Sequence, residues 1–476
     1  MLFNSAVFFK FFAAFLLLYY LVRRHLAARN LLVVAASYVF YGWWDYRFLS
    51  LLLFSSLLDY TVGRGLGATE DPRRRRWWIA LSLAGNLGLL GFFKYYNFFV
   101  DSCVVLLTHL GVNTTARTWN IVLPVGISFY TFQTLSYALD VYRRKLVPTR
   151  NLLNFLAYVS FFPQLVAGPI ERGTHLLPQF ETTRVITAGM LAEGIWLMIW
   201  GMFKKVVVAD NLAPLVDLVF QHPADSGPMV VLGTLAFGLQ IYGDFSGYSD
   251  IARGLARVLG FDLRLNFNLP YLAANVREFW RRWHISLSSW LRDYLYISLG
   301  GNRGSTARVS LNLLLTMLLG GLWHGAAWNF VLWGAWHGFG LLVHRVWSAN
   351  RAATQPPGLN AAALDRQPSR WAWALTMLFV FYGWLLFRAG SLEQVIALTR
   401  ALGHFGTPAW FGSYVLNLVA FALPLVAVQF WQARTNNLLA PLTLPAWARF
   451  TLQGVLLWTI LLFWKKQAVP FIYFQF

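Results

Sequence analysis

Leu322-Trp323-His324-Gly325-Ala326-Ala327-Trp328-Asn329-Phe330 is the stretch that decides how this sequence folds, and it lies inside an apolar tract from Leu311 to Val346. A titratable imidazole in a membrane-like tract is costly and needs a partner or a function. Because histidine gains or loses a proton near neutral pH, His324 is a candidate general base. The alternative is a histidine that packs and hydrogen-bonds between membrane helices.

The composition is that of a polytopic membrane protein. Of the 476 residues, 58% are hydrophobic and 12% are charged, which excludes an ordinary soluble domain. The formal net charge is +20, but Lys and Arg lie in short clusters between apolar runs. That pattern is typical of cytoplasmic loops and contact with anionic lipid, not of nucleic-acid binding. A single cysteine, Cys103, excludes an internal disulfide and a cysteine-based metal cluster.

Apolar runs between basic or turn-forming segments predict an all-α polytopic protein with about eleven transmembrane helices. We expect one membrane-embedded domain, residues 1–476. Arginines follow the first apolar span, and four more follow the third at residues 73–76. The positive-inside rule therefore predicts a periplasmic N-terminus. Gly168-Pro169 predicts a broken or re-entrant helix, and the aspartates and glycines of residues 243–250 predict a polar turn that is either buried or solvated.

Residues 261–308 are the least membrane-like part of the middle of the chain. Large apolar side chains recur there at steps of three and four, which predicts one amphipathic helix at the membrane interface. His284 points with this apolar stripe. The stripe consists of Trp280, Trp283, Leu287, Trp290 and Tyr294.

The residue types around His324 allow three classes of function. An enzyme would use His324 to deprotonate a hydroxyl, with a backbone amide or Asn329 stabilising the oxyanion. A transporter would use His324 as a proton relay, and a scaffold would only pack it. His324 and His337 are thirteen residues apart, about 20 Å along one straight helix, so we expect no metal site from this pair.

Several motifs resemble the membrane-bound O-acyltransferases and, within them, the alginate O-acetyltransferase branch. The matching segments span most of the chain in the family order. They are Pro124-Val125-Gly126-Ile127-Ser128-Phe129-Tyr130, Pro163 with Ala167-Gly168-Pro169, Asp244-Phe245-Ser246-Gly247-Tyr248-Ser249-Asp250, Phe279-Trp280-Arg281-Arg282-Trp283-His284-Ile285-Ser286-Leu287-Ser288, Trp290-Leu291-Arg292-Asp293-Tyr294 and Gly320-Gly321-Leu322-Trp323-His324-Gly325.

The resemblance implies an architecture and two catalytic positions. Transmembrane helices would form a ring, with interfacial and re-entrant helices, around a central catalytic tunnel. His324 matches the catalytic histidine of the family, and His284 matches its second histidine. A cytoplasmic pocket for the acyl donor and an outward-facing funnel would meet near His324.

The resemblance also implies a reaction. An acetyl group would pass from cytoplasmic acetyl-CoA across the bacterial inner membrane for O-acetylation of an extracytoplasmic polysaccharide. An alginate-like polymer is the first choice, with cellulose or peptidoglycan as alternatives. Acetyl-CoA would be a substrate, and no cofactor would be tightly bound. An extracytoplasmic acetyltransferase would be the partner protein.

Coenzyme A carries phosphates, for which arginine and lysine are the expected counter-charges. The candidates are the arginines close to His284 in the sequence. Contact with lipid headgroups is the alternative for each of them. They are Arg277, Arg281, Arg282 and Arg292.

The last six residues, 471–476, are almost all apolar or aromatic, and we expect them to dock. The segment resembles the C-terminal tail of the small single-span partner in the D-alanylation system. We hypothesise that Tyr473 approaches His324 from the outer side, is deprotonated by it, and carries the acyl group onward. The alternative is an aromatic anchor at the interface, and Lys465 and Lys466 argue for a cytoplasmic tail.

Overall fold

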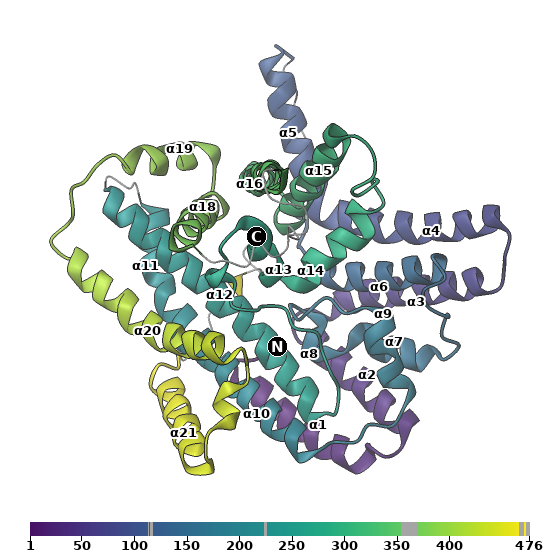
Figure 1. Cartoon of the computed structure of the whole chain (residues 1–476). Coiled ribbons are helices and arrows are strands. Elements are labelled where there is room, and N and C mark those ends of the chain that lie inside the picture. Colours follow the sequence, from purple (N-terminus) through teal and green to yellow (C-terminus); the bar gives the residue numbers. More distant parts are fainter. Residues whose placement is uncertain (113, 115–117, 223–225, 354–368, 466–470, 473–476) are drawn as a thin grey trace. The chain divides into compact units, whose positions relative to one another are not determined.

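The computed structural model describes residues 1–476 except 113, 115–117, 223–225, 354–368, 466–470 and 473–476. The regular structure of the described residues is helical, without a strand among them, which confirms the all-α prediction (Figure 1). They form two compact units. The first comprises residues 1–195 and 251–264, and the second comprises residues 196–250 and 265–476.

The first unit contains the N-terminal helices. Their bounds are α1 (Ala6–Val22), α2 (Leu26–Gly42), η1 (Tyr46–Phe48), α3 (Leu49–Gly67), α4 (Pro72–Leu90), η2 (Gly91–Tyr95), α5 (Tyr96–His109), α6 (Ile127–Tyr142), α7 (Leu152–Ser160), α8 (Phe162–Leu165) and α9 (Gly173–Glu181). Two further helices, α10 (Ala188–Met202) and α12 (Gly227–Val258), contribute residues to both units.

The second unit contains the central histidines. Its remaining helices are η3 (Phe203–Ala209), α11 (Asp210–Gln221), η4 (Pro270–Leu272), α13 (Val276–Arg282), α14 (Ile285–Trp290), η5 (Leu291–Tyr296), α15 (Thr306–His324), α16 (Trp328–Ala353), α18 (Arg370–Arg388), α19 (Leu392–Ala401), α20 (Phe411–Thr435), η6 (Ala440–Thr443) and α21 (Ala446–Leu462).

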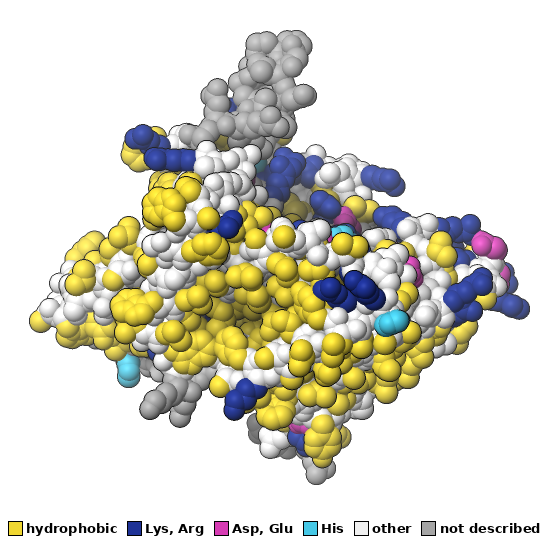
Figure 2. Space-filling view, turned by 90° about the horizontal axis from the view of Figure 1, so that it is seen from below, with side chains coloured by type: hydrophobic (Ala, Val, Ile, Leu, Met, Phe, Trp, Pro, Cys, Tyr) yellow, Lys and Arg dark blue, Asp and Glu magenta, His cyan; other side chains and the backbone are white. Residues whose placement is uncertain are grey.

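Five helical segments within the described residues are long and apolar enough to cross a membrane: residues 72–109, α12, α15, α18 and α20. Three shorter helices, α1, α2 and α21, are also apolar. Hydrophobic side chains cover most of the face seen in Figure 2, while Lys and Arg gather mainly toward its upper and right-hand margins. This surface is that of a protein embedded in a bilayer.

The polar interior of the first unit shows how buried polar groups are accommodated. α3 packs against α4 and α6. Between α3 and α4, the buried Asp59 carboxylate accepts hydrogen bonds from the Ser82 hydroxyl at 2.5 Å and the Asn86 amide at 2.9 Å. A buried carboxylate without such donors would cost several kcal/mol, roughly.

The structure tests three local predictions. Residues 166–172, around Gly168-Pro169, are non-helical between α8 and α9, so the predicted helix break is confirmed. The prediction of a polar turn at residues 243–250 is wrong, because these residues continue the 32-residue helix α12. The prediction of a single interfacial helix is also wrong. The segment forms three elements, α13, α14 and η5, and the chain breaks between α13 and α14 at His284, whose backbone is left-handed (φ 43°).

His175, on α9, lies between two carboxylates, those of Glu171 and Asp262. The His175 Nδ1 atom lies 2.8 Å from Glu171 Oε2, and Nε2 lies 3.3 Å from Asp262 Oδ2. Hydrogen bonds to Asp262 and Glu171 outweigh the effect of burial and raise the pKa of His175 to about 9. The same contact lowers the pKa of Asp262.

The raised pKa predicts a pH-dependent contribution to stability. Because protonated His175 is favoured in the folded state, its stabilisation is fully present below the ordinary pKa of 6.5 and is lost as pH rises through about 9. Partial exposure screens the effect, so we expect His175→Gln to destabilise the protein by about 1–2 kcal/mol at pH 6. Thermal unfolding at pH 6 and pH 10 should show a difference only at the lower pH. The exposed His222→Gln is the control, and an equal loss at both pH values would contradict the assignment.

Candidate active site

The position of His324 follows from the close approach of α15 and α16. A Cβ atom added at Gly321 would lie 2.2 Å from the Phe330 carbonyl oxygen, and one added at Gly334 would lie 2.4 Å from the Met317 carbonyl oxygen. Only glycine permits such contact between helix backbones. His324 is the last residue of α15, so this packing fixes where the imidazole lies.

Aromatic rings surround His324, whose exposed fraction is 4%. Its ring centroid lies 5.0 Å from those of Trp323 and Trp333 and 5.5 Å from that of Phe387. The His284 ring centroid lies 6.4 Å away. The structure therefore brings together the two histidines that the sequence singled out, from elements forty residues apart.

His284 is completely buried, and its orientation is set by Asn266. The Asn266 Oδ1 atom lies 3.1 Å from His284 Nδ1 and also accepts from the backbone amide and hydroxyl of Ser286. The Asn266 amide donates to the Ser249 hydroxyl at 3.2 Å. Because Oδ1 is an acceptor, Nδ1 of His284 carries the hydrogen, and in the neutral ring Nε2 is the acceptor.

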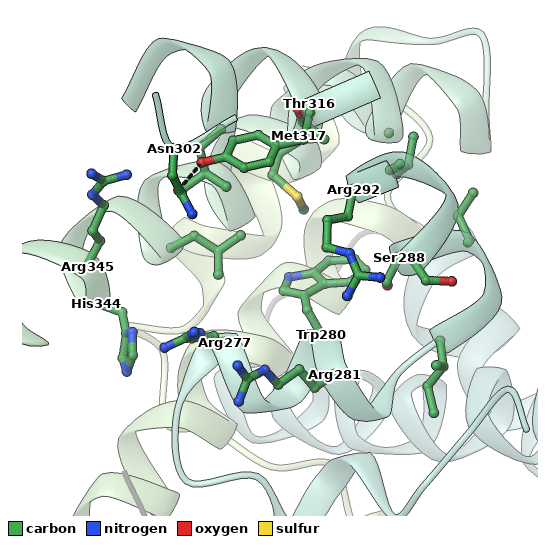
Figure 3. A pocket seen from close by; sticks show the side chains of 18 of the residues that line it. Arg277, Trp280, Arg281, Ser288, Arg292, Asn302, Thr316, Met317, His344 and Arg345 are labelled. Carbon is green, nitrogen blue, oxygen red and sulfur yellow. Dashed lines mark hydrogen bonds between the residues drawn. The ribbon is translucent and has the colours of Figure 1, made fainter. Parts of the chain in front are cut away.

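A cavity of about 580 Å³ lies beside this pair and is lined by residues of α13, α14, η5, α15 and α16. His324 lines it, together with Trp280 and Trp333. Its lining contains four arginines and no aspartate or glutamate. In Figure 3, His344 and Arg345 lie at the left of the cavity, Arg277 and Arg281 lie along the bottom, and Arg292 lies at the right. Such a cavity suits an anionic ligand with an apolar portion.

Three of the four predicted arginines therefore line one cavity. Arg282 is not among the lining residues, and its guanidinium is paired with Glu278 at 2.6 Å. Arg292 lines the cavity although it is paired with Asp293 at 2.7 Å. Sequence reasoning missed His344 and Arg345. Helical spacing could have indicated this face of α16. Leu341 follows Trp333 by eight residues and Arg345 follows Leu341 by four, so the three side chains share one face of the helix.

Asn329 is placed differently from the expectation for an oxyanion donor. Its amide donates to the carbonyl oxygens of Phe387 at 3.4 Å and Ala389 at 2.8 Å. Both hydrogens of the amide group are thereby engaged in holding the start of α16 to the end of α18. Asn329 is a structural residue in this arrangement.

Buried ion pairs occupy the segments that the sequence had marked as polar. The Lys205 amine lies 2.9 Å from both Asp210 and Asp244, and Lys204 lies 2.6 Å from Asp250. Pairing removes much of the cost of burying these charges. It explains why residues 243–250 remain helical inside the second unit.

The C-terminal segment docks at the same place. Phe471 and Ile472 are buried, and the Ile472 amide donates to Asp244 Oδ2 at 2.7 Å. The Phe471 ring lies 5.7 Å from that of Phe245, whose centroid lies 4.6 Å from His284. The docking expected for the tail is therefore seen in these two residues. Tyr473 lies outside the described residues.

Comparisons with known proteins agree with the geometry. The sequence model of the MBOAT, membrane-bound O-acyltransferase, family matches residues 141–385. The chain is 46% identical over 375 residues to the "Probable alginate O-acetylase AlgI" of Azotobacter vinelandii, covering 78% of this chain and 72% of that protein. It is 36% identical over 395 residues to a peptidoglycan O-acetyltransferase of Helicobacter pylori, with 77% and 72% covered. It is 26% identical over 303 residues to a teichoic acid D-alanyltransferase of Streptococcus thermophilus, with 60% and 72% covered.

Proposed function

Because the chain belongs to the membrane-bound O-acyltransferase family and is an acyltransferase, we propose that it moves an acetyl group from cytoplasmic acetyl-CoA toward an extracytoplasmic polysaccharide. The observation that carries this proposal is the arginine-lined cavity that reaches His324. A CoA thioester combines phosphates, which suit arginine, with a reactive carbonyl, which must meet a base. No other described feature brings both requirements to one place.

In the proposed reaction, an acceptor hydroxyl gives its proton to His324 as its oxygen attacks the thioester carbonyl carbon. The tetrahedral intermediate then breaks its carbon–sulfur bond, and the departing thiolate takes the proton from His324. The products are an acetyl ester and free coenzyme A. His284 supports this step as a neighbour held in one tautomer by Asn266, able to orient or polarise the site.

The order of the proposed acceptors follows the similarity to the relatives. The similarity to an alginate O-acetylase at 46% identity favours an alginate-like polymer. The similarity to a peptidoglycan O-acetyltransferase at 36% supports the second choice, and cellulose is the third. The proposal includes a bacterial inner-membrane location, a periplasmic N-terminus, about eleven spans around a central tunnel, contact with anionic lipid and an extracytoplasmic acetyltransferase partner.

A transporter with His324 as proton relay is the rival function, and thioester turnover separates the two. Purified protein in lipid nanodiscs should release free thiol from acetyl-CoA when an acceptor is supplied. His324→Ala should reduce this release to background, on the order of 10³-fold, because the base is lost. The exposed His109→Ala is the matched control. Full thiol release by His324→Ala would contradict the catalytic assignment, and substrate flux without turnover would favour the transporter.

Charge reversal tests the donor cavity. We expect Arg281→Glu, Arg292→Glu and Arg345→Glu each to raise the KM for acetyl-CoA by about tenfold, because each removes a counter-charge for phosphate. Arg303→Glu, exposed and outside the cavity lining, is the control. The measurement is initial rate against donor concentration in nanodiscs of neutral lipid. Unchanged KM values in all three variants would assign these arginines to lipid headgroups instead.

We further propose that Tyr473 relays the acyl group. The buried Phe471 and Ile472 support this, since they contact Phe245 and Asp244, and the Phe245 ring in turn packs against His284. The Lys465 amine donates to the Asp210 carbonyl oxygen at 2.7 Å. The positive-inside rule applied to Lys465 argues for a cytoplasmic tail, which the relay proposal does not require.

Tyr473→Phe keeps the ring and removes only the hydroxyl. If Tyr473 carries the acyl group, this variant should lose polymer acetylation in cells while its thermal stability stays at the wild-type value. The measurement is ester content of the secreted polysaccharide. Phe471→Leu, which alters packing without touching a hydroxyl, is the comparison. Wild-type ester content in Tyr473→Phe would make the tyrosine an interfacial anchor.

A further inference from the structure

Two tryptophans of the cavity wall hold buried indole N–H groups. Trp280 and Trp333 both line the cavity with His324. Across the part of the chain that the structure describes, neither indole nitrogen has a hydrogen-bond partner, and both are shielded from solvent. A buried donor left unsatisfied costs about 1–3 kcal/mol, so native proteins retain one mainly where a ligand or water completes it.

The Ser348 hydroxyl of the wall lies 3.5 Å from His344 Nδ1. The four other hydroxyls of the wall donate to protein oxygens that are close in the sequence. These hydrogen bonds run from Thr316 to Asn312 at 2.7 Å, from Ser288 to Trp283 at 3.2 Å, from Ser289 to Ser286 at 3.0 Å and from Tyr296 to Asn302 at 2.7 Å. Asn329, the donor expected from the sequence, is engaged by two carbonyls.

The two indoles lie at the histidine end of the cavity. The Trp333 ring centroid is 5.0 Å from that of His324, with the rings at 83°, and 5.6 Å from that of Trp280. Figure 3 shows the Trp280 side chain on the wall of the cavity, near Arg292. Arg281 and Arg292, by contrast, are exposed residues. The cavity therefore offers charged donors where it is open and neutral donors where it is closed.

We propose that the indole N–H groups of Trp280 and Trp333 hydrogen-bond the carbonyl oxygen of the bound thioester and form the oxyanion hole of the transfer. This rests on the proposed acyl transfer. When the acceptor oxygen adds to the carbonyl carbon, the carbon–oxygen π electrons move onto the carbonyl oxygen, and both indoles donate to that negative charge. The charge returns to re-form the carbonyl as the carbon–sulfur bond breaks, and His324 carries the proton from hydroxyl to thiolate.

Neutral donors suit this position. A guanidinium beside His324 would disfavour the imidazolium that forms when the acceptor is deprotonated. An indole N–H stabilises the oxyanion without adding a positive charge to the site. Removing one donor of an oxyanion hole typically lowers kcat by about 10²–10³-fold.

The test replaces the N–H and keeps the ring. Trp333 and Trp280 are each replaced by β-(3-benzothienyl)alanine, in which sulfur stands for the N–H, and in parallel by phenylalanine. Thiol release from acetyl-CoA is measured with purified full-length protein in nanodiscs, with the acceptor supplied. We expect kcat to fall about 100-fold in each benzothienyl variant with the donor KM within twofold of wild type. Trp384→Phe, a buried tryptophan of the same aromatic cluster that does not line the cavity, should keep wild-type kcat.

The outcomes separate the possible failures. Wild-type kcat in both benzothienyl variants overturns the proposal and makes the tryptophans packing residues. A loss in the phenylalanine variants alone has the same meaning, because only those variants change the shape of the wall. Absence of thiol release by the wild-type protein with both acetyl-CoA and acceptor would contradict the proposed acyl transfer itself, which is a different result.

Discussion

The contact between the backbones of α15 and α16 is the constraint on which the rest of the second unit depends. Gly321 and Gly334 let the two helices approach until any side chain at either position would collide with a carbonyl oxygen. Helix packing in membranes uses small residues in this way, because lipid supplies no hydrophobic drive for helices to associate. His324 is the last residue of α15. The close packing of α15 on α16 therefore also determines where the central histidine of the site lies.

Buried charge is the second constraint, and it acts through pairing. Lys205 lies between Asp210 and Asp244, and Asp244 uses its other oxygen to hold the Ile472 amide. A dry interior makes an unpaired charge far more costly than in water. The pairs allow α12 to remain helical through a run of aspartates and glycines, and they give the end of the chain a fixed docking point.

The sequence could predict what is encoded locally. The intramembrane His324, the helical fold, the break at Gly168-Pro169 and the arginines at 277, 281 and 292 all follow from neighbouring residues or helical spacing. Prediction from the sequence failed where a residue's interaction partner comes from a distant segment. Residues 243–250 have the composition of a polar turn, but their aspartates pair with Lys204 and Lys205 in the folded protein and remain in a helix. In the sequence Arg282 resembles the neighbouring arginines, and only the structure shows its ion pair with Glu278. The residues around Asn266 likewise give no sign in the sequence that its side chain orients His284.

The cavity combines two requirements that conflict in a single environment. An anionic donor is best held by charged side chains that remain partly hydrated, as the exposed Arg281 and Arg292 do. Proton transfer at His324 is best served by a closed, neutral surrounding, where electrostatic interactions are strong. The structure separates the two along one cavity, with guanidinium groups toward the opening and tryptophan rings around His324. This separation explains the abundance of tryptophan around the histidine: an aromatic ring excludes water as a hydrocarbon does, and an indole adds one donor without adding charge.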